Sequence, residues 1–155
     1  MVKTISVILV PTDYSTCTGE AIGWAVSLAV PLSASLLLLH VIRREIADEM
    51  LSIPGMNWET LVQREKKALI ELYRNWVSEE EGSSLLKETV VAVGDPAKKI
   101  VTTALENQVD LIVIPTYGRK EPPADGGESV SEQVVRMAAC PVMTIQAACC
   151  DEPCL

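Results

Sequence analysis

Asp13 is the first side chain in the sequence that is placed to do chemistry, because it closely follows the apolar run 5–10. Its carboxylate can accept hydrogen bonds from the hydroxyl groups of a ribose. It can equally cap the helix predicted to begin at Thr16, and the residue types alone favour neither role. His40, the only histidine, lies near the end of the second apolar run. No nucleophile or base stands near it in the sequence, so we expect it to shape a pocket rather than to catalyse.

A polar segment rich in proline and glycine, 115–128, supplies the third candidate. It leads into a helix predicted to begin at Ser129. The free N–H groups and the positive dipole end of such a helix suit an anion such as a phosphate. Three segments are therefore expected to meet around a ligand, and they are 11–15, 41–44 and 115–131.

Five short apolar runs are predicted to be the strands that position these segments: 5–10, 35–41, 88–93, 110–114 and 142–145. Amphipathic helices are expected between them, the first ending before Pro31, whereas 43–56 reads as an irregular connection. Apolar strands that alternate with amphipathic helices predict an α/β fold, an open parallel five-stranded sheet with helices on both faces. Ligands bind such sheets outside the carboxyl ends of the strands.

The composition limits the classes of partner. The 155 residues carry 13 basic and 21 acidic side chains, a net charge of −8, which disfavours nucleic acid and anionic membranes as partners. We expect one domain over 1–146 and a flexible tail over 147–155 that contains Cys149, Cys150 and Cys154. Neither a signal peptide nor a membrane span is visible, and the five cysteines form no disulfide framework, so a cytoplasmic location is expected.

Several short motifs, taken in their order and spacing, resemble the universal stress protein family from about residue 3 to residue 146. They are Pro11-Thr12-Asp13-Tyr14-Ser15, His40-Val41, Gly94-Asp95-Pro96, the run 110–114 with Thr116-Tyr117-Gly118-Arg119, the run 129–136, and Cys140-Pro141-Val142. The resemblance implies a Rossmann-like sheet of the adenine nucleotide alpha hydrolase type with strand order 3-2-1-4-5. It also implies a homodimer joined through the last strand.

The same resemblance implies a site for ATP or AMP. Its adenine and ribose side would be lined by Pro11, Thr12, Asp13 and the backbone of Val41, and its phosphate side by Gly118, Ser129 and Val130. Members that bind ATP carry three glycines and a Ser or Thr in a fixed spacing, because phosphates approach the backbone closely.

Two positions of that pattern are changed here. It falls on Pro115, Gly118, Glu128 and Ser129. Pro115 lacks an N–H donor, and Glu128 places a carboxylate where phosphate oxygens would lie. A one-residue deletion in the loop would instead put Gly127 at the third glycine position.

We therefore expect a dimeric stress-response binding or regulatory module that acts on a protein partner, is not an enzyme, holds no metal site of its own and binds ATP weakly or not at all. The alternative is an adenine-nucleotide switch that binds ATP or AMP with Mg²⁺ and hydrolyses ATP slowly.

Overall fold

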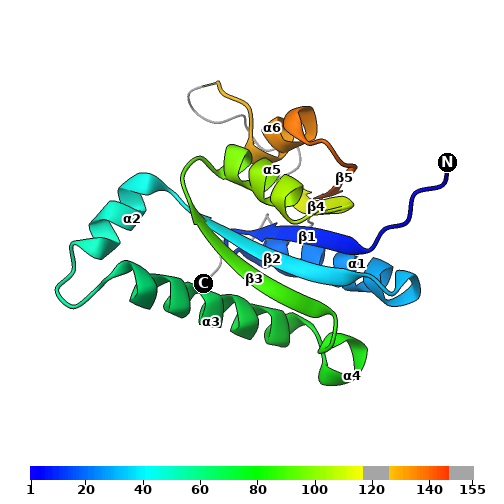
Figure 1. The fold of residues 1–155 in the computed structure, drawn as a ribbon, viewed down its shortest axis with the longest axis horizontal. Coiled ribbons are helices and arrows are strands. Elements are labelled where there is room, and N and C mark those ends of the chain that lie inside the picture. The colour runs from blue at the N-terminus through cyan, green and yellow to red at the C-terminus, as the bar shows by residue number, and fades with distance from the viewer. Residues whose placement is uncertain (117–125, 147–155) are drawn as a thin grey trace.

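The computed structural model describes residues 1–116 and 126–146, which form a parallel sheet between two layers of helices (Figure 1). Gly118 and the tail 147–155 lie outside the described residues. The sheet order is β3-β2-β1-β4-β5, so the predicted parallel α/β class and the strand order implied by the resemblance are confirmed. The strands are β1 (Val7–Thr12), β2 (Ser35–Ile42), β3 (Leu86–Val93), β4 (Leu111–Thr116) and β5 (Val142–Gln146).

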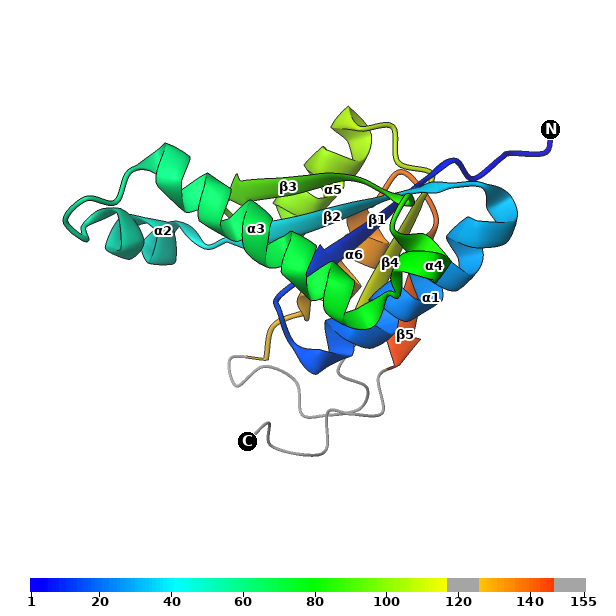
Figure 2. The ribbon, with the colours of Figure 1, turned by 90° about the horizontal axis from the view of Figure 1, so that it is seen from below.

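Within residues 1–116 and 126–146, six helices lie between the strands. They are α1 (Thr16–Leu32), α2 (Arg44–Leu51), α3 (Trp58–Trp76), α4 (Glu79–Gly82), α5 (Pro96–Glu106) and α6 (Val130–Met137). Helices α1 and α3 pack on one face, and α5 and α6 pack on the other (Figures 1 and 2). The central strands are buried on both sides, which explains why their sequences are apolar throughout.

Strands β1 and β4 are joined tightly at one end only. The Asp110 carboxylate accepts the N–H groups of Ser6 and Val7 at 2.8 and 3.0 Å, which fixes the start of β1 beside the start of β4. The β1–β4 ladder consists of Ile8–Leu111 and Leu9–Ile112, whereas the β1–β2 ladder has six pairs. The order of the strands reverses between β1 and β4, and open α/β sheets bind ligands at this point.

Two predictions about the segments between strands were wrong: the end of the first helix and the irregular segment 43–56. Helix α1 continues through Pro31 to Leu32, because a proline in the last turn removes a single hydrogen bond before Ser33 ends the helix at φ 51°. Helix α2 occupies part of the segment expected to be irregular. Its buried Ala47 packs with Ile42 and Leu61, so contacts with β2 and α3 stabilise a helix that is only 8 residues long.

Candidate functional site

The predicted adenosine-side residues lie together where β1 and β2 end. Thr12 is the register partner of His40, and Pro11 is the partner of Leu39. Val41 is the next residue along β2, beside the position where Asp13 leaves β1. Pro11 and Thr12 are buried, Val41 is half-buried and Asp13 is exposed. This strip therefore offers an exposed carboxylate beside a largely buried floor.

Asp13 holds the loop that joins β1 to α1. Its Oδ1 atom accepts the backbone N–H of Ser15 at 3.0 Å and the hydroxyl of Thr18 at 3.1 Å. Ser15, not Asp13, is the N-cap residue of α1, and these two bonds hold the loop and the Thr18 side chain rather than a backbone N–H of the first helical turn. These bonds also fix the orientation of the carboxylate at the carboxyl end of the sheet, the end at which open α/β sheets bind ligands.

The hydroxyl of Ser15 is the one buried side-chain polar atom without a hydrogen-bond partner among residues 1–116 and 126–146. Ser15 is the N-cap residue of α1, yet its own hydroxyl makes no capping bond. A buried hydroxyl without a partner costs about 1–3 kcal/mol, so it favours a polar group or a water molecule beside it. The site thus contains an unused donor and acceptor next to Asp13.

Tyr14 adopts a conformation that is uncommon for a tyrosine, with φ at 65°. Its backbone N–H donates to the hydroxyl of Thr12 at 2.9 Å, and its phenol donates to Oε2 of Glu65 at 2.8 Å. Burial and the hydrogen bond to Glu65 raise the pKa of the Tyr14 phenol well above its ordinary value. Helix α3 therefore fixes the side chain that follows Asp13.

His40 completes this cluster. Its Nδ1 lies 2.9 Å from the carbonyl oxygen of Thr12, and because a carbonyl only accepts, Nδ1 carries the proton. Its Nε2 lies 4.0 Å from Oε2 of Glu65, and its ring contacts the Tyr14 ring at 4.5 Å between centroids. His40 thus supports the end of β1, and its role in shaping a pocket stays a prediction.

Glu65 is the site residue that sequence reasoning missed. It lies on the buried face of α3 with Leu61, Leu69 and Tyr73, and its residue exposure is 9%. A carboxylate at a core position of an amphipathic helix was the available signal, because buried carboxylates need hydrogen-bond partners. Its partner Tyr14 stands 51 positions away in the sequence.

The predicted phosphate side, by contrast, is occupied by the chain's own groups. Ser129 Oγ accepts the N–H of Glu132 at 3.2 Å, and the Glu132 carboxylate accepts the N–H of Ser129 at 2.8 Å. This capping box places a negative charge at the N-terminus of α6. Val130 begins the helix and is half-buried. Pro115 lies near the end of β4 as the register partner of Ile145.

Glu128 forms an ion pair with Arg136. Its two oxygens lie 2.6 and 3.3 Å from Nη2 and Nε of Arg136, and this contact raises the pKa of the guanidinium. Both side chains are at least half exposed, so the pair holds Glu128 in place without much stability. The negative charge of Glu128 is therefore partly neutralised by Arg136, a residue of α6.

Neither a metal centre nor a membrane segment is found in the described part of the chain. No three His, Cys, Asp or Glu side chains there are grouped to hold a metal ion. Within the same residues, no helix is both long enough and apolar enough to cross a bilayer.

Comparison with known proteins identifies the family. The profile of the Universal stress protein family matches residues 4–146, which include every strand of the sheet. The chain belongs to the universal stress protein family. Its relatives include universal stress protein YxiE of Bacillus subtilis, which is 28% identical over 143 residues, with 89% of this chain and 97% of that protein covered.

Solved structures of universal stress proteins share the fold. A universal stress protein in complex with cAMP matches with a TM-score of 0.72 at 20% identity, covering 93% of this chain and 99% of that chain. The universal stress protein from Archaeoglobus fulgidus in complex with dAMP matches with a TM-score of 0.58 at 18% identity, covering 94% and 100%. The chain therefore has the adenine nucleotide alpha hydrolase-like fold of this family.

Proposed function

We propose that this universal stress protein is a dimeric, cytoplasmic stress-response module that binds an adenine nucleotide carrying a single phosphate. The observation that carries the proposal is the contrast between the two halves of the site. The adenosine half presents Asp13 and an unpartnered hydroxyl on Ser15, whereas the phosphate half is filled by carboxylates of the chain itself.

The adenosine half suits a nucleoside. Asp13 is held by two hydrogen bonds and lies at the carboxyl end of β1, where an oriented carboxylate can accept from a ribose. Val41, beside it, is only half-buried and would offer its backbone groups to the adenine edge. That one relative is described in complex with cAMP and another in complex with dAMP supports the same ligand class here.

The phosphate half suits a small anionic charge better than a triphosphate. Glu132 already accepts the N–H of Ser129, and Pro115 has no N–H to offer. The carboxylate of Glu128 adds a second negative charge directly before α6, although Arg136 offsets part of it. Repulsion grows with the charge of the ligand, so AMP is expected to bind more tightly than ATP.

Calorimetric titration of nucleotide-free protein with AMP and with ATP, each with Mg²⁺, tests this function. We expect AMP to bind with a micromolar Kd, about −8 kcal/mol, and ATP to bind about tenfold more weakly. Asp13→Asn keeps an oxygen for Ser15 and Thr18 but removes the charge, and we expect it to weaken AMP binding about tenfold. Asp48→Asn, an exposed change on α2, is the matched control and leaves AMP binding unchanged.

The proposal fails if neither nucleotide produces heat or a thermal shift. In that case the module acts through a protein partner alone. Tighter binding of ATP than of AMP would contradict the account of the phosphate half. We propose no catalysis, and release of phosphate from ATP with Mg²⁺ above the rate of the Asp13→Asn variant would favour the hydrolase alternative.

The proposed dimer forms through the last strand. Strand β5 is an edge of the sheet and pairs only with β4 within the described residues, so its outer side can pair with a second copy. Thr144 is exposed near the middle of this strand. We expect Thr144→Lys to place like charges across the two-fold axis and to yield monomers in sedimentation analysis, whereas an unchanged dimer would contradict the β5 interface.

A further inference from the structure

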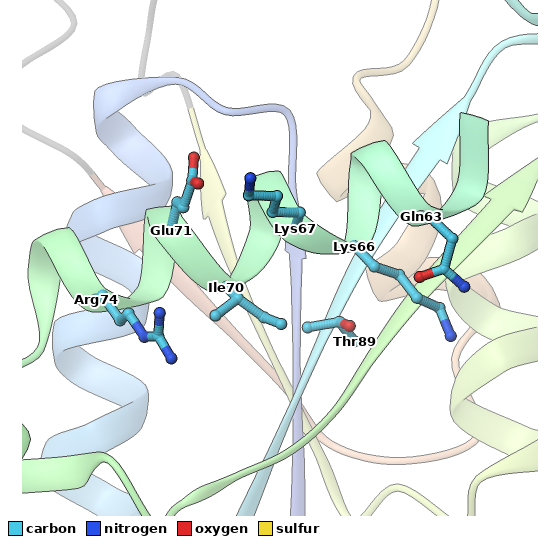
Figure 3. Close-up of a pocket in the computed structure, with 7 residues that line it drawn as sticks. All are labelled: Gln63, Lys66, Lys67, Ile70, Glu71, Arg74 and Thr89. Carbon is cyan, nitrogen blue, oxygen red and sulfur yellow. The ribbon is translucent and has the colours of Figure 1, made fainter. Parts of the chain in front are cut away.

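The opposite edge of the sheet carries a feature that nucleotide binding does not use. Strand β3 is the other edge strand and pairs only with β2 within the described residues. Helix α3 runs beside it, and the two elements enclose a surface hollow of about 350 Å³ (Figure 3). An adjoining hollow of about 290 Å³ continues along the start of β3. Together they form a groove, which we call the α3–β3 groove.

Basic side chains dominate the α3–β3 groove. Its floor contains Ile70 and the buried Thr89, and Figure 3 shows Lys66 and Arg74 extending from α3 toward β3. Together the two hollows are lined by four cations, Lys66, Lys67, Arg74 and Lys87, and by two carboxylates, Glu71 and Glu88, a local charge of +2. The chain as a whole has a charge of −8, so the local charge of the groove is opposite in sign to that of the chain.

These four cations form no ion pair within the described part of the chain, residues 1–116 and 126–146. Beside them, the outer edge of β3 presents backbone N–H and C=O groups that no other strand among the described residues pairs. The groove therefore combines free hydrogen-bonding groups along a strand with unpaired positive charge on the helix above it.

We propose that the α3–β3 groove binds an extended acidic peptide segment of another protein, which adds to the sheet as a strand beside β3. Side chains of an added strand alternate between the two faces of the sheet, so every second one would face α3. The matching segment carries Asp or Glu at alternate positions, and about eight residues would span the 8 residues of β3.

The charges argue against the other occupants. A second copy that paired through β3 would bring Lys87 and Lys66 of both copies together, and like charges across an edge oppose pairing. A nucleic acid would meet the net charge of −8 around a small basic area. An extended acidic peptide satisfies both the cations and the edge of the strand.

Fluorescence anisotropy with labelled eight-residue peptides tests the proposal. The probe alternates glutamate with threonine. A second peptide has four glutamates followed by four threonines, so its charge is the same but its spacing is not. We expect the alternating peptide to bind saturably and to bind more weakly as salt is added. We expect it to bind about tenfold more tightly than the peptide with four consecutive glutamates. N-methylation of the backbone at alternate residues of the probe is expected to abolish binding, because the added strand loses its donors.

Charge reversal in the groove supplies the protein-side test. We expect the double variant Lys66→Glu and Lys87→Glu to weaken binding of the alternating peptide at least about tenfold. The double variant Lys3→Glu and Lys98→Glu changes the net charge equally at exposed positions away from the groove, and it leaves binding within about twofold. The neutral variant Lys66→Gln and Lys87→Gln falls between them, and circular dichroism confirms that each variant is folded.

Three results would overturn the proposal. Equal affinity for the peptide with four consecutive glutamates would show that charge attracts the peptide without strand pairing. Unchanged binding after charge reversal in the groove would place the peptide elsewhere. Tighter binding of an eight-nucleotide oligothymidylate than of the peptide would make the groove a nucleic-acid site. AMP binding at the carboxyl edge of β1 is measured separately, so the two proposals fail independently.

Discussion

The phenol of Tyr14 and the carboxylate of Glu65 are joined by a 2.8 Å hydrogen bond, although 51 positions separate them in the sequence. The bond ties the loop after β1 to the buried face of α3. It also holds Tyr14 in its left-handed conformation, which costs about 1 kcal/mol or more for a residue with a side chain. The geometry of Asp13, the preceding residue, therefore depends on a helix far away in the sequence.

A double-mutant cycle measures this link. We expect Tyr14→Phe and Glu65→Gln each to destabilise the protein by about 1–3 kcal/mol, because each leaves a partly buried partner without its hydrogen bond. Their coupling energy, from urea unfolding, is expected to be about 1 kcal/mol or more. The control cycle pairs Tyr14→Phe with Glu71→Gln on the exposed face of α3, and a coupling of equal size there would contradict the direct bond.

Stability at high pH gives a second prediction. The pKa of Tyr14 is raised in the folded state by burial and by Glu65, whereas an unfolded tyrosine titrates near 10. The folded protein therefore holds the phenol proton more tightly than the unfolded chain, so the stabilisation is complete below pH 10 and is lost progressively above it. Tyr14→Phe is expected to flatten this alkaline loss in urea unfolding, and an unchanged slope above pH 10 would count against the raised pKa.

Gly19 and Gly23 of α1 offer a matched pair of substitutions. A Cβ at Gly19 would overlap the ring of Trp76 on α3, whereas nothing lies within 4 Å of a Cβ at Gly23. We expect Gly19→Ala to destabilise by about 1–3 kcal/mol through overpacking. Gly23→Ala is expected to stabilise by up to about 1 kcal/mol, because alanine favours helix. Thermal unfolding distinguishes the two, and equal stabilisation by both would disprove the Gly19–Trp76 contact.

Restoring a glycine tests the placement of the phosphate side. Glu128→Gly removes a carboxylate and frees Arg136, the residue that pairs with it. We expect ATP to bind about tenfold more tightly, a gain of about 1.4 kcal/mol. Arg136→Gln leaves Glu128 without its partner and is expected to weaken ATP binding instead. The absence of any gain in a folded Glu128→Gly variant would mean that the motif is placed wrongly or that Pro115 alone closes the site.

Most of the fold could be predicted from the sequence because the strands are buried on both faces. Runs such as 35–41 and 110–114 have no polar side that could make them helices of the surface. Helix α2 was missed because its stability comes from contacts of Ala47 with β2 and α3, and such contacts leave little periodicity in 8 residues. The fold domain 1–146 stays a prediction, as does the tail beyond it.

The candidate site was predictable only in part. Asp13 directly follows β1 and Val41 lies in the last two residues of β2, so a parallel sheet necessarily brings them to one edge. The pairs Tyr14–Glu65 and Glu128–Arg136 depend on side-chain directions that no local pattern records. The helical spacing of Trp58, Tyr73 and Trp76 predicts that all three pack in the core. That prediction is wrong for the two tryptophans, because Trp58 and Trp76 are 46% and 47% exposed while Tyr73 is buried.

The short ladder between β1 and β4 divides the sheet into two parts, β3-β2-β1 and β4-β5, which are paired directly at two positions only. The hydrogen bonds of Asp110 join the two parts where β1 and β4 begin, and α1 packs on both of these strands. A ligand bound at the carboxyl ends of β1 and β4, which are not paired with each other, would contact both parts of the sheet and hold them together. Amide hydrogen exchange is then expected to slow in both β1 and β4 when nucleotide binds. The edge strand β3 is expected to keep its exchange rate.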